Sequence, residues 1–387
     1  MSAEFMFPRG IDADMTELVQ IEPGLSPGAG GGTAAPAAFT GETKSRNSRR
    51  RRPEFVRRQE DRSQAWRSAF QLVFLVLNAW IGIQFFLWVL HWETGGRTLA
   101  VSRPPGVEGW LPIASLMNLK AWVLTGELPA IHPAGVFLLV AFLGVSLVFR
   151  KSFCGWLCPI GTVSETLARA GQALLGRNWM LPRWADVALR SVKYVLLGLF
   201  LYAVGGMSVA AIRQFLDGPY GIVADVKMLN FFRSPSLTAL VVLGALVVLS
   251  VLVRQFWCRY LCPYGALMGL ASWVSPATIR RVPAKCIECG KCSRVCPSRL
   301  PVDRLATVRS PECIGCYQCV AACPVSGALD MRLGRRLVLS PAWFGAGVAA
   351  VFLVLVLVAR VTGHWHTHLP DPVYRELVPI ADRFSHP

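Results

Sequence analysis

Charged residues are scarce in this sequence, and acidic residues are scarcer than basic ones. Charged residues make up 16 % of the 387 positions, whereas soluble domains carry about 25 %. There are 23 acidic and 40 basic residues, a formal net charge of +17, and 53 % hydrophobic residues. This composition excludes an ordinary soluble domain and indicates a membrane protein. Loops that face anionic lipid explain the positive charge, so no nucleic acid partner is required.

Five uncharged apolar runs are long enough, or nearly long enough, to cross a membrane. They are Ser68–Leu90, Pro133–Phe149, Tyr194–Ile212, Leu237–Val253 and Ser340–Ala359. The second and fourth runs are short. We therefore expect their helices to continue by a turn into the flanking arginines, whose side chains would reach the membrane surface.

The basic residues predict the orientation of these spans. With a cytoplasmic amino terminus, 31 of the 40 Lys and Arg residues fall on the cytoplasmic side. The amino terminus and the segment between the fourth and fifth runs are then cytoplasmic, and the carboxyl terminus lies outside. Residues 1–64 are rich in Pro, Gly, Ala and Arg, which predicts a disordered basic tail.

No cysteine lies outside four short motifs, and two of these motifs have the spacing C-x2-C-x2-C-x3-C-P. In this spacing three thiolates bind one [4Fe-4S] cluster, and the fourth, before proline, binds the neighbouring cluster. Zinc knuckles would leave cysteines unused, and a disulfide framework suits small secreted domains. The sequence therefore predicts a ferredoxin with two [4Fe-4S] clusters. The ligands are Cys286, Cys289, Cys292 and Cys323 for cluster I, and Cys313, Cys316, Cys319 and Cys296 for cluster II.

The other four cysteines form two C-x3-C-P motifs within an internal repeat. A shift of 104 residues places Phe149–Gly161 on Val253–Gly265, and each copy follows an apolar run of the same direction. Two such hairpins would be related by an axis along the membrane normal. That axis would bring four thiols together at the cytoplasmic surface. They belong to Cys154, Cys158, Cys258 and Cys262.

Three interpretations of this tetrad of cysteines stay open. It could bind a third iron–sulfur cluster or another metal, or it could form a reversible disulfide or a transient copper site, because thiolates are soft ligands. Purely structural cysteines are the third interpretation, which the duplicated Cys-Pro pair disfavours. The prolines disfavour helical geometry at Cys158 and Cys262, so each motif is expected at a helix end or bend.

Other residues give weaker signals. The absence of C-x2-C-H excludes covalent attachment of c-type haem. His364, His366 and His368 alternate and would share one face of an extended segment, where they could bind Cu or Zn; a solvated tail is the alternative. Glu108 and Glu165 could assist proton release from a quinol, although a paired or solvated carboxylate is the commoner role.

The order of two C-x3-C-P motifs, an eight-cysteine ferredoxin and a final span resembles the NapH/NosR-type membrane polyferredoxins. The resemblance covers Ser68–Ala359 and includes Arg103-Pro104, Val107–Ile113 and His132-Pro133. It implies a bacterial inner-membrane protein that carries electrons between quinol or cytoplasmic donors and a periplasmic reductase system. The implied partners are other redox subunits, and the implied activity is that of a quinol dehydrogenase subunit. The covalent flavin motif and the large periplasmic domain of NosR are missing, so the expected protein is the membrane core alone.

The CcoG-type assembly proteins also carry a ferredoxin and a C-x3-C-P motif. They are linked to copper reduction, but they have a sizeable periplasmic domain where this chain has a short segment. Copper handling is therefore the alternative function. The expected fold is mainly α, a helical membrane protein of about five transmembrane helices, two parallel hairpins plus one, with an inserted α+β ferredoxin domain. The expected divisions are a tail (1–64), a membrane core (65–275), the ferredoxin (276–337), a last span (338–361) and a periplasmic tail (362–387).

Overall fold

The computed structural model describes residues 61–385 of the chain. The predicted disordered tail, 1–64, lies outside the described residues except for its last positions, where the first helix begins at Ser63. The described part is mainly helical and contains one small sheet, as the sequence predicts.

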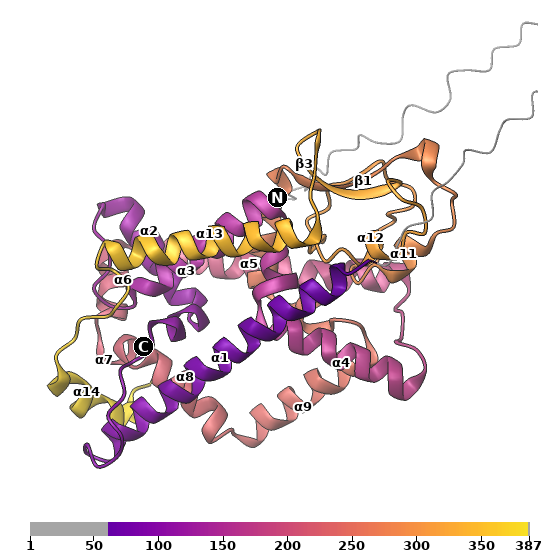
Figure 1. Cartoon of the computed structure of the whole chain (residues 1–387). Helices are drawn as coiled ribbons and strands as arrows, with labels where there is room; N and C mark the ends of the chain where they lie inside the picture. Colours follow the sequence, from indigo (N-terminus) through magenta and orange to yellow (C-terminus); the bar gives the residue numbers. More distant parts are fainter. Residues whose placement is uncertain (1–60, 386–387) are drawn as a thin grey trace, which may run out of the picture. The chain divides into compact units, whose positions relative to one another are not determined.

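Long helices run between two ends of the described chain (Figure 1). One end holds the ferredoxin segment, and the other holds short helices and the last described residues. Three of these helices are long and apolar enough to cross a membrane, and α8 with α9 would add a fourth span, although this pair is bent by 78°. The shorter α3 is also apolar. The helices are α1 (Ser63–Glu93), α3 (Pro133–Phe149), α5 (Arg183–Gly206), α8 (Ala224–Arg233), α9 (Leu237–Leu252) and α13 (Pro341–Val361).

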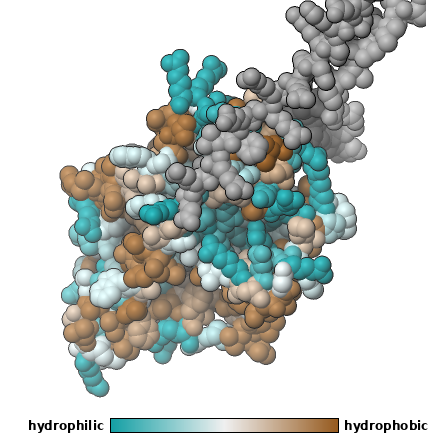
Figure 2. All heavy atoms as spheres, turned by 45° about the vertical axis from the view of Figure 1, so that its right-hand side comes forward, coloured by the Kyte–Doolittle hydropathy of each residue, from teal (hydrophilic) through white to brown (hydrophobic). Residues whose placement is uncertain are grey.

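The outward faces of these helices are apolar, as contact with lipid requires. Leu72 of α1, Val195 of α5, Val241 of α9 and Leu353 of α13 are all exposed. Figure 2 shows broad hydrophobic areas, in brown, over the helical part. The chain is therefore a membrane protein whose helices have unpartnered apolar faces.

The expectation that the second and fourth helices continue into arginines is wrong. Helix α3 ends at Phe149 because Arg150 adopts φ 62° and ψ −170°, and α9 ends at Leu252 before the extended Val253. The side chain of Arg150 does not reach the membrane surface but is buried, and its Nη2 donates to the carbonyl of Ser310 at 2.7 Å. Partners distant in sequence thus end the helix. Likewise α5 ends at Gly206, before the Ile212 that the third run predicts.

Shorter helices connect the long ones. The end opposite the ferredoxin carries η1, α2, α6, α7, α14 and η6, and the ferredoxin end carries η2, α4, η3, α10 and η4. The opposite-end bounds are Pro105–Trp110, Pro112–Thr125, Val209–Leu216, Pro219–Ile222, Asp371–Leu377 and Val378–Arg383. The ferredoxin-end bounds are Phe153–Leu157, Pro159–Leu175, Trp257–Leu261, Pro263–Ala271 and Ser272–Val274.

The ferredoxin segment is a four-stranded antiparallel sheet with the order β2-β1-β3-β4, covered by short helices. In the central pair Ile279 lies opposite Met331. Both side chains are buried on the face that joins the main core. Thr278 lies opposite Arg332 on the other face. The bounds are β1 Ala277–Arg281, η5 Pro283–Lys285, α11 Lys291–Val295, β2 Thr307–Val308, α12 Gln318–Ala321, β3 Leu329–Leu333 and β4 Leu337–Val338.

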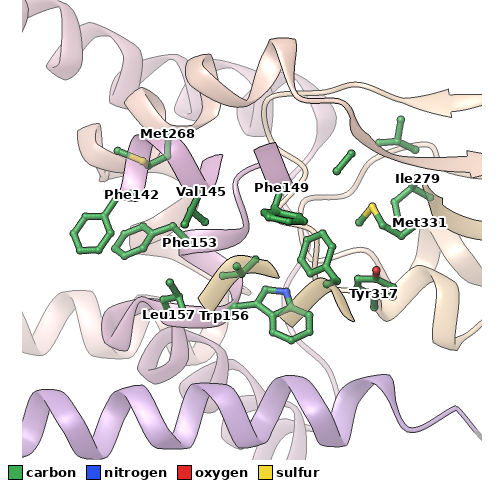
Figure 3. Close-up of a cluster of buried hydrophobic side chains, with 14 of the residues drawn as sticks. Phe142, Val145, Phe149, Phe153, Trp156, Leu157, Met268, Ile279, Tyr317 and Met331 are labelled. Atoms are coloured by element: carbon green, nitrogen blue, oxygen red, sulfur yellow. The ribbon is translucent and has the colours of Figure 1, made fainter. Parts of the chain in front are cut away.

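One hydrophobic core extends from the membrane helices into the ferredoxin (Figure 3). Trp156 is fully buried and packs against both Phe344 of α13 and Tyr317 of the ferredoxin, with ring centroids 5.3 and 6.2 Å away. Aromatic pairs at such distances add about 0.5–1.5 kcal/mol each beyond burial. The ferredoxin is therefore packed onto the membrane helices and not tethered by a linker.

Each repeat packs one of its helices against a helix of the other repeat. Helix α4 of the first packs against α9 of the second, and α10 of the second packs against α3 of the first. The crossing of α4 and α9 is close, because a Cβ on Gly171 would lie 1.9 Å from the carbonyl oxygen of Val251. Close backbone approach at small residues is typical of membrane helices. This exchange is the arrangement expected of two repeats related by a twofold axis.

Candidate iron–sulfur centres

Each predicted set of ferredoxin cysteines lines one cavity. The first cavity is lined by Cys296, Cys313, Cys316 and Cys319, and the second by Cys286, Cys289, Cys292 and Cys323. The other lining residues are mostly apolar, such as Ile279, Leu300 and Val302 around the first. The structure thus brings together the sets that the spacing assigns to clusters II and I. The donor set of four thiols in an apolar cavity fits a [4Fe-4S] cluster.

The two cysteine loops have the same backbone form. The third cysteine of each motif, Cys292 or Cys319, lies in a short helix that follows a residue with positive φ, Gly290 at 66° and Tyr317 at 59°. Glycine adopts this conformation freely, whereas a tyrosine requires support from its surroundings. Tyr317 is buried, and its hydroxyl donates to the carbonyl of Leu339 at 3.1 Å.

The two C-x3-C-P motifs also share one backbone form. Each contains a single π-helical turn, and the chain then becomes extended at Cys158 or Cys262, with the proline as first residue of the next helix. Such π turns are rare and occur often at functional sites. Each motif lies at a bend between two helices, as the prolines predict.

The four thiols of the tetrad lie together at the ferredoxin end. Burial, together with the nearby thiols of Cys262 and Cys154, raises the pKa of Cys258 to about 12. Burial likewise raises the pKa of Cys158 well above its usual value, with contributions from the other three thiols. None of the twelve cysteines forms a disulfide.

A buried lysine faces the tetrad. Lys151 is 3 % exposed, and its ammonium interacts electrostatically with Cys154, Cys262 and Cys258. The ammonium nitrogen lies 3.5 Å from the position that a Cβ on Gly265 would take, and the sulfur of Cys262 lies 3.6 Å from the same point. A residue of the first motif's loop therefore reaches the second motif. Lys151 was not among the residues predicted from the sequence. Its position three residues before Cys154 is the feature of the sequence that could have indicated a place near the tetrad.

Both C-x3-C-P loops contact the loops that carry the cluster II cysteines. Trp156 Nε1 donates to the carbonyl of Gly315 at 3.0 Å, between Cys313 and Cys316. A Cβ on Gly155 would lie 2.7 Å from the carbonyl oxygen of Ile314, so only glycine permits this approach.

The second loop makes an equivalent contact. Arg259 Nη1 donates to the carbonyl of Pro297 at 3.1 Å, directly after Cys296, the fourth thiol of the same cavity. The tetrad and the cluster II cavity are therefore neighbours through both halves of the repeat.

Buried ion pairs fix the same region. Arg67 Nη1 of α1 donates to Glu165 Oε2 of α4 at 2.8 Å, and Gln318 of the cluster II loop donates to Glu165 Oε1 at 3.0 Å. Lys193 of α5 donates to Glu312, the residue before Cys313, at 2.6 Å. Although burial alone would raise the pKa of Glu312, the ammonium groups of Lys151 and Lys193 lower it to about 2. Glu165 is thus a paired carboxylate.

A second buried network lies at the opposite end. Arg103 donates to Glu108 at 2.8 Å and to Asp225 at 2.6 Å. His132, with φ 56°, has Nδ1 3.6 Å from Glu108, and Thr367 of the carboxyl-terminal segment donates to Glu108 at 2.8 Å. Glu108 is therefore a paired carboxylate that joins four segments of the chain.

The structure does not bring the three predicted tail histidines together as a metal site. His364 packs on the ring of Phe137, with centroids 6.5 Å apart. Within residues 61–385 no three His, Cys, Asp or Glu side chains are placed to hold a single metal ion, and this includes His366 and His368.

Comparisons with known proteins agree with this geometry. The family described as a 4Fe-4S binding domain matches residues 131–182 and 236–281, the two segments that contain the C-x3-C-P motifs, and the family described as a 4Fe-4S dicluster domain matches residues 278–324. No solved structure matches the chain.

Of three curated relatives, one is named for electron transport, one as a ferredoxin-type protein and one as a regulatory protein. The electron transport protein YccM of Escherichia coli (strain K12) is 47 % identical over 327 residues, 83 % of this chain and 92 % of the relative. The ferredoxin-type protein NapH of Haemophilus influenzae is 28 % identical over 67 % of this chain and 85 % of its own length. The regulatory protein NosR of Pseudomonas aeruginosa is 29 % identical over 48 % of this chain and 25 % of its own length. The chain belongs to the NapH/NosR-type membrane polyferredoxins, a family of electron transport proteins with 4Fe-4S domains.

Proposed function

We propose that the chain transfers electrons between the ferredoxin and a third centre at the tetrad, and that cluster II is the neighbour of this centre. The proposal rests on one observation. Both C-x3-C-P loops donate hydrogen bonds to the cluster II loops, Trp156 to Gly315 at 3.0 Å and Arg259 to Pro297 at 3.1 Å. Short paths through packed protein favour electron transfer, and this contact is duplicated.

The proposed ligands of the ferredoxin are the crossed sets, four cysteines for each cluster. The supporting observation is that the thiols of each set line one cavity. Iron–sulfur clusters supply one-electron transfer. The residues of this chain hold the thiols in place, and apolar side chains such as Ile279 and Leu300 keep water from the cluster II cavity.

For the tetrad we favour a third [4Fe-4S] cluster among the interpretations. The matching family is described as a 4Fe-4S binding domain over both motif segments. The buried ammonium of Lys151 supports this choice, because a cation balances part of the negative charge that four thiolates and a cluster bring. Net charge and hydrogen bonds near a cluster set its reduction potential.

We further propose that the ferredoxin faces the cytoplasm and that the last described residues lie in the periplasm. The distribution of basic residues supports this orientation. In that arrangement a quinol or a cytoplasmic donor supplies electrons, and a periplasmic respiratory system accepts them. The relative named ferredoxin-type protein NapH supports a role beside other redox proteins.

Copper handling is the second candidate function. The clustering of the four tetrad thiols favours it, because soft thiolates bind Cu(I) as well as iron clusters. Among residues 61–385 no three such side chains are placed around one metal ion, so a copper site here would use two thiols or a rearranged tetrad. In this function the ferredoxin would supply electrons that keep copper reduced. The two candidates predict different metal contents.

Anaerobically purified protein should contain about twelve iron atoms and a similar amount of acid-labile sulfide per chain, with no copper. The double variant Cys154→Ser/Cys258→Ser should lose about four of these iron atoms, because it removes two of the four tetrad ligands. Elemental analysis of both proteins measures this difference. About eight iron atoms with one bound copper would favour the copper function. Iron-free protein that still transfers electrons would refute both candidate functions.

If the ligation is crossed, substitutions of cysteines that bind the same cluster should alter the same spectroscopic signal. Cys292→Ser should change the electron paramagnetic resonance signal of cluster I, as should Cys323→Ser. Cys296→Ser should change the signal of cluster II, as should Cys319→Ser. Lys291→Arg, an exposed position next to Cys292 that keeps its charge, is the control. If Cys292→Ser and Cys296→Ser altered the same signal, the assignment would be wrong.

A further inference from the structure

Three arginines gather around a pocket where the ferredoxin meets the membrane helices. The pocket has a volume of about 220 Å³ and is lined by Arg280, Arg309 and Arg335 together with Trp273 and Val274. None of the described residues that line it is acidic. The cluster ligands and the tetrad do not line it, so it has no part in the proposed electron path.

The surrounding charges leave the pocket positive. Asp330 is the cross-strand neighbour of Arg280 on the same face of the sheet. Arg332 lies opposite the lining residue Thr278, and its Nε is buried without a hydrogen-bond partner among the described residues. One carboxylate therefore faces four guanidinium groups, which favours an anionic ligand with several oxygen acceptors. Arginine suits phosphate because its planar fork donates two parallel hydrogen bonds.

The pocket lies close to the ferredoxin-side ends of the apolar helices α3 and α13. The lining residue Ser275 accepts a hydrogen bond from the backbone N–H of Arg150, directly after α3, at 2.9 Å. The lining residue Gly334 precedes β4, and α13 begins at Pro341, soon after that strand. The pocket is therefore placed at the depth of lipid headgroups.

Exposed apolar residues flank the same pocket. Trp273 is 65 % exposed and Val274 is 77 % exposed, and both lie in the turn after α10. Leu337 and Val338 of β4 are exposed as well. A phospholipid has this chemistry, since its phosphate matches the arginines and its acyl chains match the apolar rim. Tryptophan is enriched at this depth.

We propose that this pocket binds the phosphate-bearing headgroup of an anionic phospholipid, with the acyl chains against Trp273 and Val274. The site is independent of the redox centres, so the test of this proposal does not depend on the proposed function. It would orient the ferredoxin on the membrane surface by a specific lipid contact, in addition to the general attraction between basic loops and anionic lipid.

Native mass spectrometry of the full chain with its clusters tests the site. The purified protein is titrated with a short-chain phosphatidylglycerol, with the matching phosphatidylcholine, and with inorganic phosphate. We expect phosphatidylglycerol to bind and the other two to bind at least tenfold more weakly. The variant Arg280→Gln/Arg309→Gln/Arg335→Gln should bind phosphatidylglycerol on the order of 100-fold more weakly. Replacement of the same three residues by Lys should restore only part of the affinity, because an ammonium group keeps the charge but lacks the planar fork.

The control variant Arg177→Gln/Arg183→Gln/Arg304→Gln removes the same charge at exposed positions that do not line the pocket. It should bind the lipid like the wild type, and iron content checks that each variant is folded. Equal loss in the control would mean general electrostatics and would overturn the site. Equal binding of phosphatidylcholine, or phosphate as tight as the lipid, would also overturn it. If the triple Gln variant fails to fold, Arg335→Gln alone, in an exposed turn, should still lower the affinity severalfold.

Discussion

Replacement of Cys158 by alanine should stop electron delivery from the ferredoxin to the membrane-embedded part. The substitution removes one of the four tetrad thiols, which the structure places apart from the two ferredoxin cavities. The ferredoxin clusters should keep their spectroscopic signals, because Cys158 lines neither cavity. Stopped-flow reoxidation of the reduced protein by a quinone analogue measures delivery. We expect the rate of the variant to fall to that of a cluster-free preparation.

The control for this experiment is Thr166→Ala, an exposed position on the helix that follows Cys158. It should leave both the rate and the signals unchanged. Wild-type rates in Cys158→Ala would refute the relay through the tetrad. Loss of all cluster signals would instead give the tetrad a structural role.

Replacement of Glu108 by glutamine should destabilise the opposite end of the protein by about 3–5 kcal/mol. Glu108 is fully buried and pairs with Arg103 and His132, so the substitution leaves buried cations without their carboxylate. Glu127→Gln is the matched control, because Glu127 is 69 % exposed on its side chain and pairs with the half-exposed Arg213. An exposed pair contributes about 0–1 kcal/mol. Equal losses of unfolding free energy in detergent would contradict the prediction.

The effect of Glu108→Gln should depend on pH. Although burial alone would raise it, the Arg103 guanidinium and the His132 imidazole lower the pKa of Glu108 to about 2. This contribution to stability is present above about pH 4.5 and is lost as the pH falls toward 2. Burial alone would lower the pKa of His132, but the Glu108 carboxylate raises this pKa overall. The stability that comes from the His132–Glu108 pair is therefore present below about pH 6.5 and is lost as the pH rises through the raised pKa of His132. The two proteins should therefore differ most between about pH 4.5 and 6.5.

The ferredoxin and the repeat could be predicted from the sequence because their signals are local. The spacing of thiols in a cluster motif is set by the geometry of the cluster, and each predicted set lines one cavity. The prolines after Cys158 and Cys262 likewise predict the bends that the structure shows. In such segments the chemistry of neighbouring residues decides the conformation.

The buried cations could not be predicted, because their partners are distant in sequence. Arg150 follows an apolar run and has the pattern of a residue that reaches the membrane surface, yet it is buried against Ser310. Arg67 is buried against Glu165, 98 residues away. Only the tertiary structure distinguishes a basic residue in lipid headgroups from one inside the protein.

The exchange of helices between the repeats has a consequence for biogenesis. When α4 leaves the ribosome, the helix that it packs against, α9, has not been synthesised. The close approach of Gly171 to Val251 cannot form until the second hairpin has entered the membrane. The first hairpin must therefore wait in the bilayer with an unpaired face, protected by lipid or by the insertion machinery. A centre that needs all four tetrad thiols could likewise form only after both halves of the repeat are complete.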